Sequence, residues 1–502
     1  MEKLFENQNV KVVLANAGSG KTRYAIEDCI LQLNKYLPQE IAFVTFTKRG
    51  VVEGVRRIVE RTKYNTDDFV YFKTIHALSF YALGLKHENV FTEAHEKRFN
   101  AFYGFNLNRF QKTRTSPLDA KDNVYLDLYD LLRAKVISRK DVFEKEMGFD
   151  EGYFRHLVLC YNNYKDLYSL VDFYDCLINY TQGGVSLPCK VAYIDEAQDL
   201  TYLQWAVLHK AFRNAEEVII LGDDKQAIYS FAGAQPSILI ELSKRFPIEH
   251  LSKCYRLPRK VYDLSIAITK MISEKTEQKA EFLRENSEGG VFYLDGLDRL
   301  KNKIGLGETW YLLSRNKIFL EKAQNFLHEN LIPYWTEDGF FINQKDMVKL
   351  KDYFGFRLKG YKNEEAKQKF KEKYNIKSFD DDFTESDLFL YEKKYTIYSY
   401  VEKWGLDNLI KISKGQEIIL LSTIHHVKGG EADNVVLFFD ITRKVDTSFQ
   451  EDLDSELRVL YVAVTRARQN LYLVQGDNGG MMEEVFKCIT EEFLDGRSID
   501  WL

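Results

Sequence analysis

Glycines, a lysine and a threonine lie close together near the start of the chain, in a pattern that favours phosphate binding. The stretch from Ala15 to Thr22 reads A-N-A-G-S-G-K-T and follows a short apolar run. The glycines let successive backbone N–H groups turn toward one anion. Lys21 can then reach the outer phosphates of a nucleotide, and the Thr22 hydroxyl can ligate magnesium. The sequence therefore predicts a nucleotide-binding loop.

Two carboxylates supply the acid and base groups that phosphate chemistry needs. Asp195 and Glu196 directly follow the apolar run at 191–194. This order places both acids at the carboxyl end of a strand, beside the predicted phosphate loop. Asp195 is the expected magnesium ligand, acting through water, and Glu196 is the expected base for the attacking water. Gln226, which follows the apolar run at 217–221, is placed to sense the terminal phosphate.

The elements that must hold these groups alternate between strand and helix. Apolar runs at 10–14, 40–47 and 69–74 read as strands, and helical spacing follows the phosphate loop. From 88 to 165 the pattern is mostly helical, which we interpret as an insertion, and the strands resume at 190–194. Alternating strands and helices after a phosphate loop are typical of a parallel, doubly wound sheet. The predicted fold class is therefore α/β.

A second sheet is expected to begin after residue 247. Its candidate strands are the apolar runs at 249–251, 291–294, 309–313, 418–421 and 435–439. A charged stretch at 336–411 interrupts this sheet and is interpreted as a second, shorter insertion. The expected domains are therefore 1–87 with 166–247, and 248–335 with 412–502, with insertions at 88–165 and 336–411.

Length and composition exclude several classes of protein. The 502 residues are too many for a single core. The formal net charge of −5 gives no overall attraction to nucleic acid, so binding would need a local basic groove. The six cysteines include no C-x-x-C pair, which disfavours zinc and redox sites and fits reduced thiols in the cytoplasm. We expect neither a signal peptide nor a membrane span, because no apolar run is long enough.

Ordered motifs from the phosphate loop to residue 468 resemble those of superfamily 1 DNA helicases of the UvrD, Rep and PcrA type. In the loop, Asn16 departs from the family's A-G-A-G-S-G-K-T. Further similar segments are T-F-T at 45–47, T-I-H at 74–76, D-E-A-Q-D at 195–199, G-D-D-K-Q-A-I-Y at 222–229, C-Y-R at 254–256, T-I-H-H-V-K-G-G-E at 423–431 and Y-V-A-V-T-R-A-R at 461–468. The two insertions match the family in position only.

This resemblance implies two RecA-like parallel-sheet domains, each with an inserted, mainly helical subdomain, and ATP with magnesium in the cleft between them. The implied nucleotide-binding residues are Ala17, Gly18, Ser19, Gly20, Lys21, Thr22, Arg23, Tyr255 and Glu431, with Thr22 and Asp195 serving the metal. Tyr255 and Arg23 would flank the adenine, and Glu431 would meet the ribose. The implied catalytic residues are Lys21, Glu196, Gln226, Arg256 and Arg466. Arg256 and Arg466, from the second RecA-like domain, resemble the family's arginine fingers.

The resemblance also implies a nucleic-acid surface. Its residues are Phe46, His76, Tyr229, Phe231 and His425. Taken alone, Tyr229 and Phe231 fit a core better than a stacking surface. Phe231 and Ala232 stand where the family often has Trp and Arg, which weakens the predicted DNA contact. Gln8 precedes Lys21 by only 13 positions, so the family's glutamine motif is shortened and adenine selectivity is not predicted.

The leading hypothesis is an ATP-driven translocase and helicase on single-stranded and tailed duplex DNA, moving 3′ to 5′ as the resemblance implies. A second hypothesis is a DNA-binding regulatory ATPase subunit that controls a partner nuclease, as in phage-defence relatives of the family. The reduced second insertion and the lack of a nuclease motif motivate it. A small-molecule kinase is disfavoured, because it explains neither Arg466 nor the aromatic motifs. The residues do not choose among repair, replication, recombination and defence.

Overall fold

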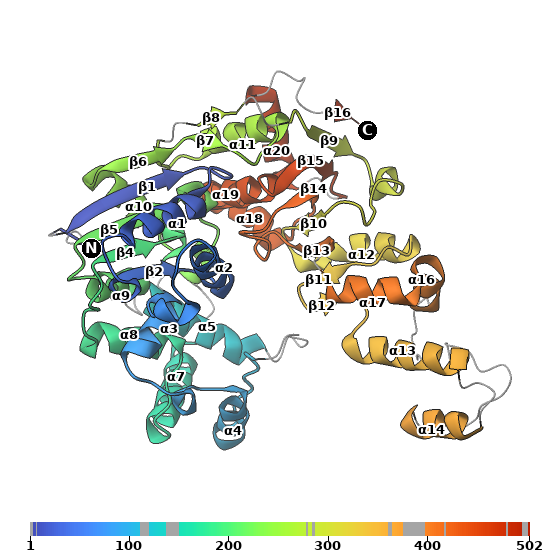
Figure 1. The fold of residues 1–502 in the computed structure, drawn as a ribbon, viewed down its shortest axis with the longest axis horizontal. Helices are drawn as coiled ribbons and strands as arrows, with labels where there is room; N and C mark the ends of the chain where they lie inside the picture. The colour runs from blue at the N-terminus through green and yellow to red at the C-terminus, as the bar shows by residue number, and fades with distance from the viewer. Residues whose placement is uncertain are drawn as a thin grey trace. The chain divides into compact units, whose positions relative to one another are not determined.

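The chain folds into two compact units, each built on its own sheet (Figure 1). The computed structural model describes residues 4–6, 8–110, 120–136, 150–277, 280–283, 287–359, 364–374, 397–415, 418–477, 480–493 and 500–501. The first unit comprises residues 1–256 and 272–284, and the second comprises 257–271 and 285–502. The chain therefore passes between the units three times.

A parallel sheet in the order β3-β2-β4-β5-β1-β6 forms the centre of the first unit. Its strands are β1 (Asn9–Ala15), β2 (Ile41–Thr45), β3 (Phe72–Thr74), β4 (Val191–Ile194), β5 (Glu217–Gly222) and β6 (Ile248–Leu251). Alternate residues of one strand enter two separate cores: Ile220 lies in one, and Ile219 and Leu221 lie in the other. Both faces of the sheet are covered, as a parallel sheet requires.

Helices cover this sheet and form the first insertion. They are α1 (Lys21–Gln32), α2 (Lys48–Val59), α3 (Ile75–Ala82), α4 (Glu93–Tyr103), α5 (Ala120–Lys135), α7 (Glu151–Leu167), α8 (Phe173–Gly183), α9 (Tyr202–Ala211) and α10 (Pro236–Arg245). Thr47 and Thr74 begin α2 and α3, because their hydroxyls accept hydrogen bonds from Gly50 N and Ala77 N. These motif threonines are therefore N-caps.

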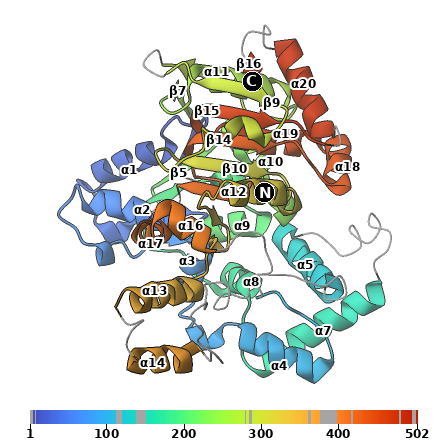
Figure 2. The ribbon, with the colours of Figure 1, turned by 90° about the vertical axis from the view of Figure 1, so that its right-hand side faces the viewer.

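The first insertion has an aromatic-rich core of its own, formed by α4, α5 and α7. In two perpendicular views, α4 and α7 lie further from the sheet than α3 and α8 (Figure 1, Figure 2). Helix α8 packs against both α3 and α9, and α5 packs against α7 and α9. The insertion is thus joined to the sheet layer through α5 and α8.

The strand predicted at 249–251 was assigned to the wrong sheet. β6 pairs in parallel with β1, with Val12 beside Ile248 and Ala15 beside Leu251, so it forms an edge of the first sheet. Four residues carry too little alternation of polar and apolar side chains to identify a partner strand. The third predicted strand, at 69–74, is shorter than expected, because only Phe72–Thr74 pair with β2.

The first unit is completed by a segment that returns from the second. β7 (Lys253–Cys254) pairs with β8 (Glu281–Phe282). Thr276 of the returning segment donates through its backbone N–H to Asp224 Oδ2 over 3.2 Å, and its hydroxyl donates to Asp224 Oδ1. The Lys225 ammonium lies 3.3 Å from Asp224 Oδ1 and donates to Thr276 O over 3.2 Å. All three residues are buried, so this contact fixes the returning segment to the loop after β5.

The second unit contains a larger sheet in the order β12-β11-β13-β10-β14-β15-β9-β16. Its strands are β9 (Gly290–Leu294), β10 (Trp310–Ser314), β11 (Trp335–Thr336), β12 (Gly339–Phe340), β13 (Ile419–Thr423), β14 (Ala432–Phe438), β15 (Ala467–Val474) and β16 (Asp500–Trp501). All pairings are parallel except the hairpin of β11 and β12. Apolar residues of β10, β13 and β14 share one core with α12.

Helices of the second unit include a second insertion with its own core. They are α11 (Arg259–Met271), α12 (Leu320–Glu329), α13 (Gln344–Lys359), α14 (Glu364–Tyr374), α16 (Ile397–Trp404), α17 (Leu406–Lys414), α18 (Arg443–Glu451), α19 (Leu453–Val464) and α20 (Met481–Phe493). Helices α18 and α20 lie side by side (Figure 2). The predicted fold class, with two parallel-sheet domains that each carry a helical insertion, is confirmed. None of the described helices has the length and apolar character needed to cross a membrane.

Candidate functional site

The order of the first sheet gathers the predicted motifs at one edge. β2, β4, β5 and β1 are consecutive neighbours, and all strands of this sheet run in parallel. Their carboxyl ends therefore lead into Phe46, Asp195, Asp223 and the phosphate loop, in that spatial order. Ligands of open parallel sheets bind at this edge. The sequence placed Asp195 and Asp223 correctly, directly after their strands, whereas the predicted second strand extended past Phe46 and β2 ends at Thr45.

The phosphate loop has the backbone that its glycines predict. Gly18 and Gly20 have φ angles of 77° and 82°, in the left-handed region, and Gly20 is the N-cap of α1. A Cβ atom at Gly18 would lie 2.8 Å from Arg256 Cβ, so no larger residue fits there. The Ser19 hydroxyl donates to Asn16 O over 2.8 Å and closes the turn. The loop thus presents the positive end of α1 to an anion.

Lys21 and the two predicted carboxylates form one group of ion pairs, in which Lys21 and Asp195 are buried and Glu196 is half-buried. The Lys21 ammonium lies 2.8 Å from Glu196 Oε2 and 3.9 Å from Asp195 Oδ1. Burial would lower the pKa of Lys21, but Glu196 and Asp195 more than offset this and raise it, so the ammonium stays charged. Burial raises the pKa of Asp195 to about 6. The Thr22 side chain hydrogen-bonds Asp195, and this hydroxyl with its carboxylate is a hard oxygen set that fits magnesium.

Glu196 has an unusual backbone conformation. Its φ of 56° and ψ of 40° lie in the left-handed region, which costs a residue with a side chain about 1–3 kcal/mol. Its N–H donates to Asp195 Oδ1 over 2.9 Å, and η4 (Ala197–Asp199) follows directly. This turn holds the Glu196 carboxylate against Lys21. Strain of this kind is often found at catalytic positions.

A buried glutamine to which the sequence analysis gave no role connects the carboxylates to Gln226. The amide of Gln198 donates to Glu196 Oε2 over 2.5 Å and accepts from Asp223 N over 3.0 Å. Gln226 in turn donates to Asp223 Oδ2 over 2.8 Å. Lys21, Glu196, Gln198, Asp223 and Gln226 therefore form one continuous network. The only signal in the sequence is the position of Gln198 within D-E-A-Q-D.

Three of the predicted stacking residues come together after β2 and β5. The rings of Phe46 and Tyr229 stack with centroids 5.2 Å apart, and Tyr229 lies 6.3 Å from Phe231. Phe231 is 68% exposed, which is unusual for a large apolar ring. His76, after β3, contacts Phe173 of α8 with centroids 5.5 Å apart. Burial lowers the pKa of His76 to about 4, so the ring is neutral near pH 7.

Arg256, which the resemblance assigned to the second domain, lies instead with Tyr255 beside the phosphate loop within the first unit. The Tyr255 N–H donates to Gly18 O over 2.9 Å, and the Cys254 thiol lies 3.6 Å from Ala17 O. The Tyr255 ring is 58% exposed, and the Arg23 side chain at the start of α1 is exposed as well. The two residues expected to flank an adenine are thus both accessible from solvent near the loop.

The remaining predicted residues belong to the second unit. Arg466 is buried, and its guanidinium donates to Val462 O over 2.9 Å and to Gly430 O over 3.0 Å. Glu431 lies 3.4 Å from Arg468 Nη1. His425 lies in the turn after β13. These contacts fix Arg466 and Glu431 on neighbouring turns of one unit.

Glu337 and Gln8 make long-range hydrogen bonds that the sequence does not predict. Glu337, which no motif indicates, accepts hydrogen bonds from Thr423 N over 2.9 Å and Thr423 Oγ1 over 2.6 Å, and so anchors the start of the 423–431 motif. Gln8 donates to Phe212 O over 2.5 Å at the amino end of β1, the end away from the phosphate loop. A long-range partner cannot be read from either local sequence.

Two family models match the chain. The UvrD/REP helicase N-terminal domain matches residues 2–247, and the UvrD-like helicase C-terminal domain matches residues 419–474. The first range holds the phosphate loop, the carboxylate pair and the aromatic group after β5. The second range holds Glu431 and Arg466. Together the matched ranges cover more than half of the chain.

Individual relatives share about a quarter of the aligned residues. The ATP-dependent DNA helicase Rep of Buchnera aphidicola subsp. Acyrthosiphon pisum is 27% identical over 274 residues, 47% of this chain and 38% of that protein. UvrD2 of Mycobacterium tuberculosis (strain ATCC 25618 / H37Rv) is 26% identical over 289 residues, 50% of this chain and 40% of that protein. PcrA of Leuconostoc citreum is 23% identical over 299 residues, 55% of this chain and 39% of that protein.

The chain therefore spans about two fifths of the length of these curated relatives. All the motifs except C-Y-R at 254–256 lie within the two matched ranges, as do strands β1–β5 and β13–β15. The chain belongs to the UvrD/Rep/PcrA-type family of superfamily 1 helicases, and its two parallel-sheet units are the RecA-like domains of that family.

Proposed function

We propose that the protein is an ATP-driven translocase and helicase on single-stranded DNA that moves 3′ to 5′ and hydrolyses ATP in the cleft between its RecA-like domains. The single observation that carries this proposal is the network from Lys21 through Gln198 to Gln226, which ends three residues before Tyr229 in the loop after β5. The relatives named ATP-dependent DNA helicases support the same activity. A cytoplasmic location is part of the proposal.

The residues of the proposed ATP site have separate roles in hydrolysis. The backbone N–H groups of the loop and Lys21 bind the phosphates, and Thr22 with Asp195 would hold magnesium. The metal, when bound, neutralises phosphate charge. Glu196 takes the proton of the attacking water, and Gln198 holds its carboxylate in place. Arg256 and Arg466 supply positive charge to the transferring phosphoryl group.

The aromatic residues form the DNA surface. Phe46, His76, Tyr229, Phe231 and, from the second unit, His425 would contact the bases. Each base stacked on an aromatic ring contributes roughly 1–3 kcal/mol, and separating one base pair costs about 1.4 kcal/mol. Stacking of one base is thus of the same size as the cost of separating one base pair, and stacking of several bases can hold a strand against reannealing. Gln226 lies three residues before Tyr229, so a change at the phosphate can reach the bases through the loop after β5.

Two measurements test this proposal together. Steady-state ATP hydrolysis by the purified protein is expected to rise strongly when single-stranded DNA is added. A duplex with a 3′ tail is expected to be unwound much faster than the same duplex with a 5′ tail. Hydrolysis that is indifferent to DNA contradicts the translocase, and equal unwinding from both tails contradicts the direction.

The alternative function is a DNA-binding regulatory ATPase that controls a partner nuclease. The exposed Ala232 beside Phe231 favours it, because the loop then offers the DNA no cation at that position. This alternative would be supported over the helicase if the purified protein showed DNA-stimulated hydrolysis but separated no strands. Strand separation would then require the partner protein.

Replacing Gln198 by Ala is expected to lower DNA-stimulated ATP hydrolysis by about 10- to 100-fold, because Glu196 and Asp223 N both lose a buried hydrogen-bond partner. The matched control is Gln204→Ala, which removes another buried amide of the same unit, bonded to Thr201 N in the cap of α9. The control should lower the melting temperature without changing the ratio of stimulated to basal hydrolysis. If the two substitutions changed the hydrolysis rates equally, Gln198 would have no specific role between the carboxylates and Gln226.

Replacing Phe231 by Ala is expected to raise the Kd for single-stranded DNA by about 5- to 150-fold, the loss of one stacked base. Phe102 of α4 is the matched control, because it is 69% exposed against 68% for Phe231. Phe102→Ala should leave the Kd unchanged in a fluorescence anisotropy titration. A similar change in both variants would mean that exposed rings bind DNA without regard to position.

A further inference from the structure

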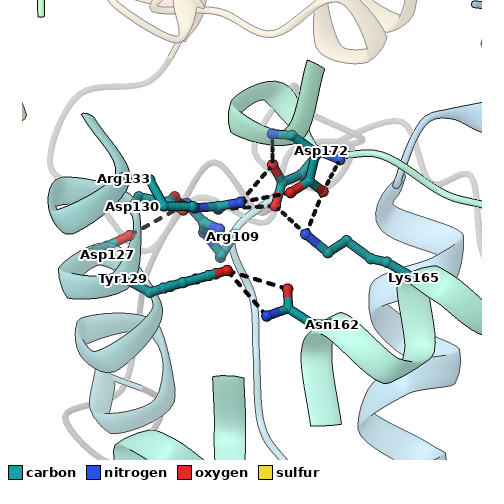
Figure 3. Close-up of polar contacts among 9 residues, drawn as sticks. Arg109, Asp127, Tyr129, Asp130, Arg133, Asn162, Lys165 and Asp172 are labelled. Carbon is teal, nitrogen blue, oxygen red and sulfur yellow. Dashed lines mark hydrogen bonds and ion pairs between the residues drawn. The ribbon is translucent and has the colours of Figure 1, made fainter. Parts of the chain in front are cut away.

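A cluster of charged side chains joins the first insertion to the start of α8, outside every motif of the family (Figure 3). Arg133 of α5 is at its centre, with Nη2 2.9 Å from Asp172 Oδ2 and Nη1 3.0 Å from Asp175 Oδ1. The Lys165 ammonium of α7 lies 2.8 Å from Asp172 Oδ2 and also pairs with Asp175. Asp130 pairs with Arg133 and with Arg109. We refer to these six residues as the charge cluster.

The charge cluster is too deeply buried to be a solvated surface network. The Arg133 and Lys165 side chains are 7% and 3% exposed. Burial alone would raise the pKa of Asp172, but Arg133 and Lys165 more than offset this and hold it well below its ordinary value. The six residues comprise three cations and three carboxylates, and the more exposed Asp127 also lies 3.6 Å from Arg109 Nη2. Ions are costly to bury, and removing one partner leaves the others uncompensated.

The cluster ties together three helices. Arg133 belongs to α5 and Lys165 to α7, while Asp172 is the N-cap of α8 and accepts a hydrogen bond from Asp175 N over 2.8 Å. A guanidinium that bonds two carboxylates through separate nitrogens fixes their orientation as well as their distance. The start of α8 is therefore fixed relative to the last turn of α5.

The start of α8 contacts one end of the proposed DNA surface. Phe173, directly after the cap Asp172, has its ring 5.5 Å from the His76 ring, edge to face. One turn later, the Cys176 thiol lies 4.0 Å from His76 O. Helix α8 also packs along α3, which begins at Ile75. The position of His76 is thus set in part by α8.

The last turn of α5 contacts the other end of that surface. Gly233, two residues after Phe231, has a φ of 95° and closes the 3-10 turn that carries the exposed ring. A Cβ atom at Gly233 would lie 3.1 Å from Ala134 Cβ and 3.5 Å from Leu131 Cδ1. Both of these α5 residues flank Arg133 in sequence. The turn that presents Phe231 therefore rests on the helix that carries the centre of the cluster.

We propose that the charge cluster is a positioning device for DNA, in which Arg133 sets the placement of the Phe231 turn relative to His76. This rests on the proposed function, because it assumes that both side chains contact bases. Arg133 acts through α5 and α8 and does not itself touch DNA. Loss of Arg133 changes the distance between His76 and Phe231, so a DNA strand can contact one of the two rings but not both. The nucleotide residues lie outside the cluster and keep their own bonds.

The test compares Arg133→Met and Arg133→Lys with Arg155→Met, which removes an exposed ion pair with Glu151 on the same insertion. Anisotropy titrations with single-stranded DNA at several salt concentrations give the Kd and its salt dependence, and DNA-independent ATP hydrolysis reports on the integrity of the unit. Arg133→Met should raise the Kd about tenfold or more, the loss of one stacked base. Basal hydrolysis and the slope of log K against log salt should stay unchanged. Arg133→Lys should restore part of the affinity, and Arg155→Met should match wild type.

Each other outcome has a definite meaning. A wild-type Kd in Arg133→Met overturns the proposal. A salt slope reduced by about one shows a direct phosphate contact by Arg133 and also overturns it. If Arg133→Met misfolds and loses basal hydrolysis, the Arg133→Lys variant is used for the test instead. A wild-type Kd in that folded variant overturns the positioning role. A raised Kd at normal basal hydrolysis supports it. Wild-type protein that hydrolyses ATP but binds no DNA refutes the proposed function itself.

Discussion

Replacing Glu196 by Gln is expected to reduce DNA-stimulated ATP hydrolysis by about 10²- to 10⁴-fold. The amide of Gln cannot accept the proton of the attacking water. Its size and shape are preserved, so it fits the same left-handed turn, and its oxygen can still accept from Lys21, which lies 2.8 Å away. Nucleotide binding should therefore survive. Phosphate release at saturating single-stranded DNA, and the Kd for a fluorescent ATP analogue, measure the two properties separately.

Glu53→Gln is the matched control for this substitution. Glu53 lies on α2 of the same unit and pairs with Arg56 and Arg57 near the surface, where an ion pair contributes little to stability. This variant should hydrolyse ATP like wild type. A Glu196→Gln variant that kept more than about a tenth of wild-type hydrolysis would assign the base to another residue.

Replacing Arg466 by Ala is expected to lower ATP hydrolysis by about 10³- to 10⁵-fold, the contribution of an arginine finger. The structure orients this guanidinium through its bonds to Val462 O and Gly430 O, so its position is set before the nucleotide binds. Nucleotide affinity should change much less than the hydrolysis rate, because the finger acts in the transition state. Single-turnover hydrolysis and equilibrium nucleotide binding distinguish the two effects.

The bonds of Arg466 also predict a cost in stability. Two carbonyls lose a buried partner in the Ala variant, which should destabilise the second unit by about 1–3 kcal/mol. Arg466→Lys keeps a cation but not the planar fork, and should be nearly as inactive as the Ala variant. Arg259→Ala removes an exposed pair with Asp263 on α11 and serves as the control. Wild-type hydrolysis in a folded Arg466→Ala variant would limit Arg466 to a structural role in its own turn.

The strand ends were the part of the site that could be predicted from sequence. Asp195 directly follows one buried apolar run and Phe46 lies at the end of another, and parallel strands bring their carboxyl ends to one edge. The proximity of Lys21 to Glu196 follows from that rule without any knowledge of side chains. The glycines at 18 and 20 likewise predict their left-handed backbone, because few other residues adopt it.

Contacts between distant residues could not be predicted in this way. Gln198 bonds Asp223 N, and Glu337 bonds Thr423, across separations that no periodicity encodes. β6 was assigned to the wrong sheet because an edge strand needs only one neighbour, which its own four residues do not specify. The charge cluster was missed for the same reason, since Arg133 and Asp172 resemble ordinary surface charges until α5 and α8 are brought together.

The threefold passage of the chain between the units has a consequence for synthesis on the ribosome. Until the segment 272–284 has left the ribosome, the first unit has no Thr276. Asp224 and Lys225 therefore cannot yet form their hydrogen bonds with this residue. By then α11 has already been synthesised, but α19, against which its apolar face packs, has not. At about 5–20 residues per second, α19 follows roughly 10–40 s later. During that interval the nascent chain carries a nearly complete first unit and an uncovered apolar helix, which is the kind of surface that chaperones recognise.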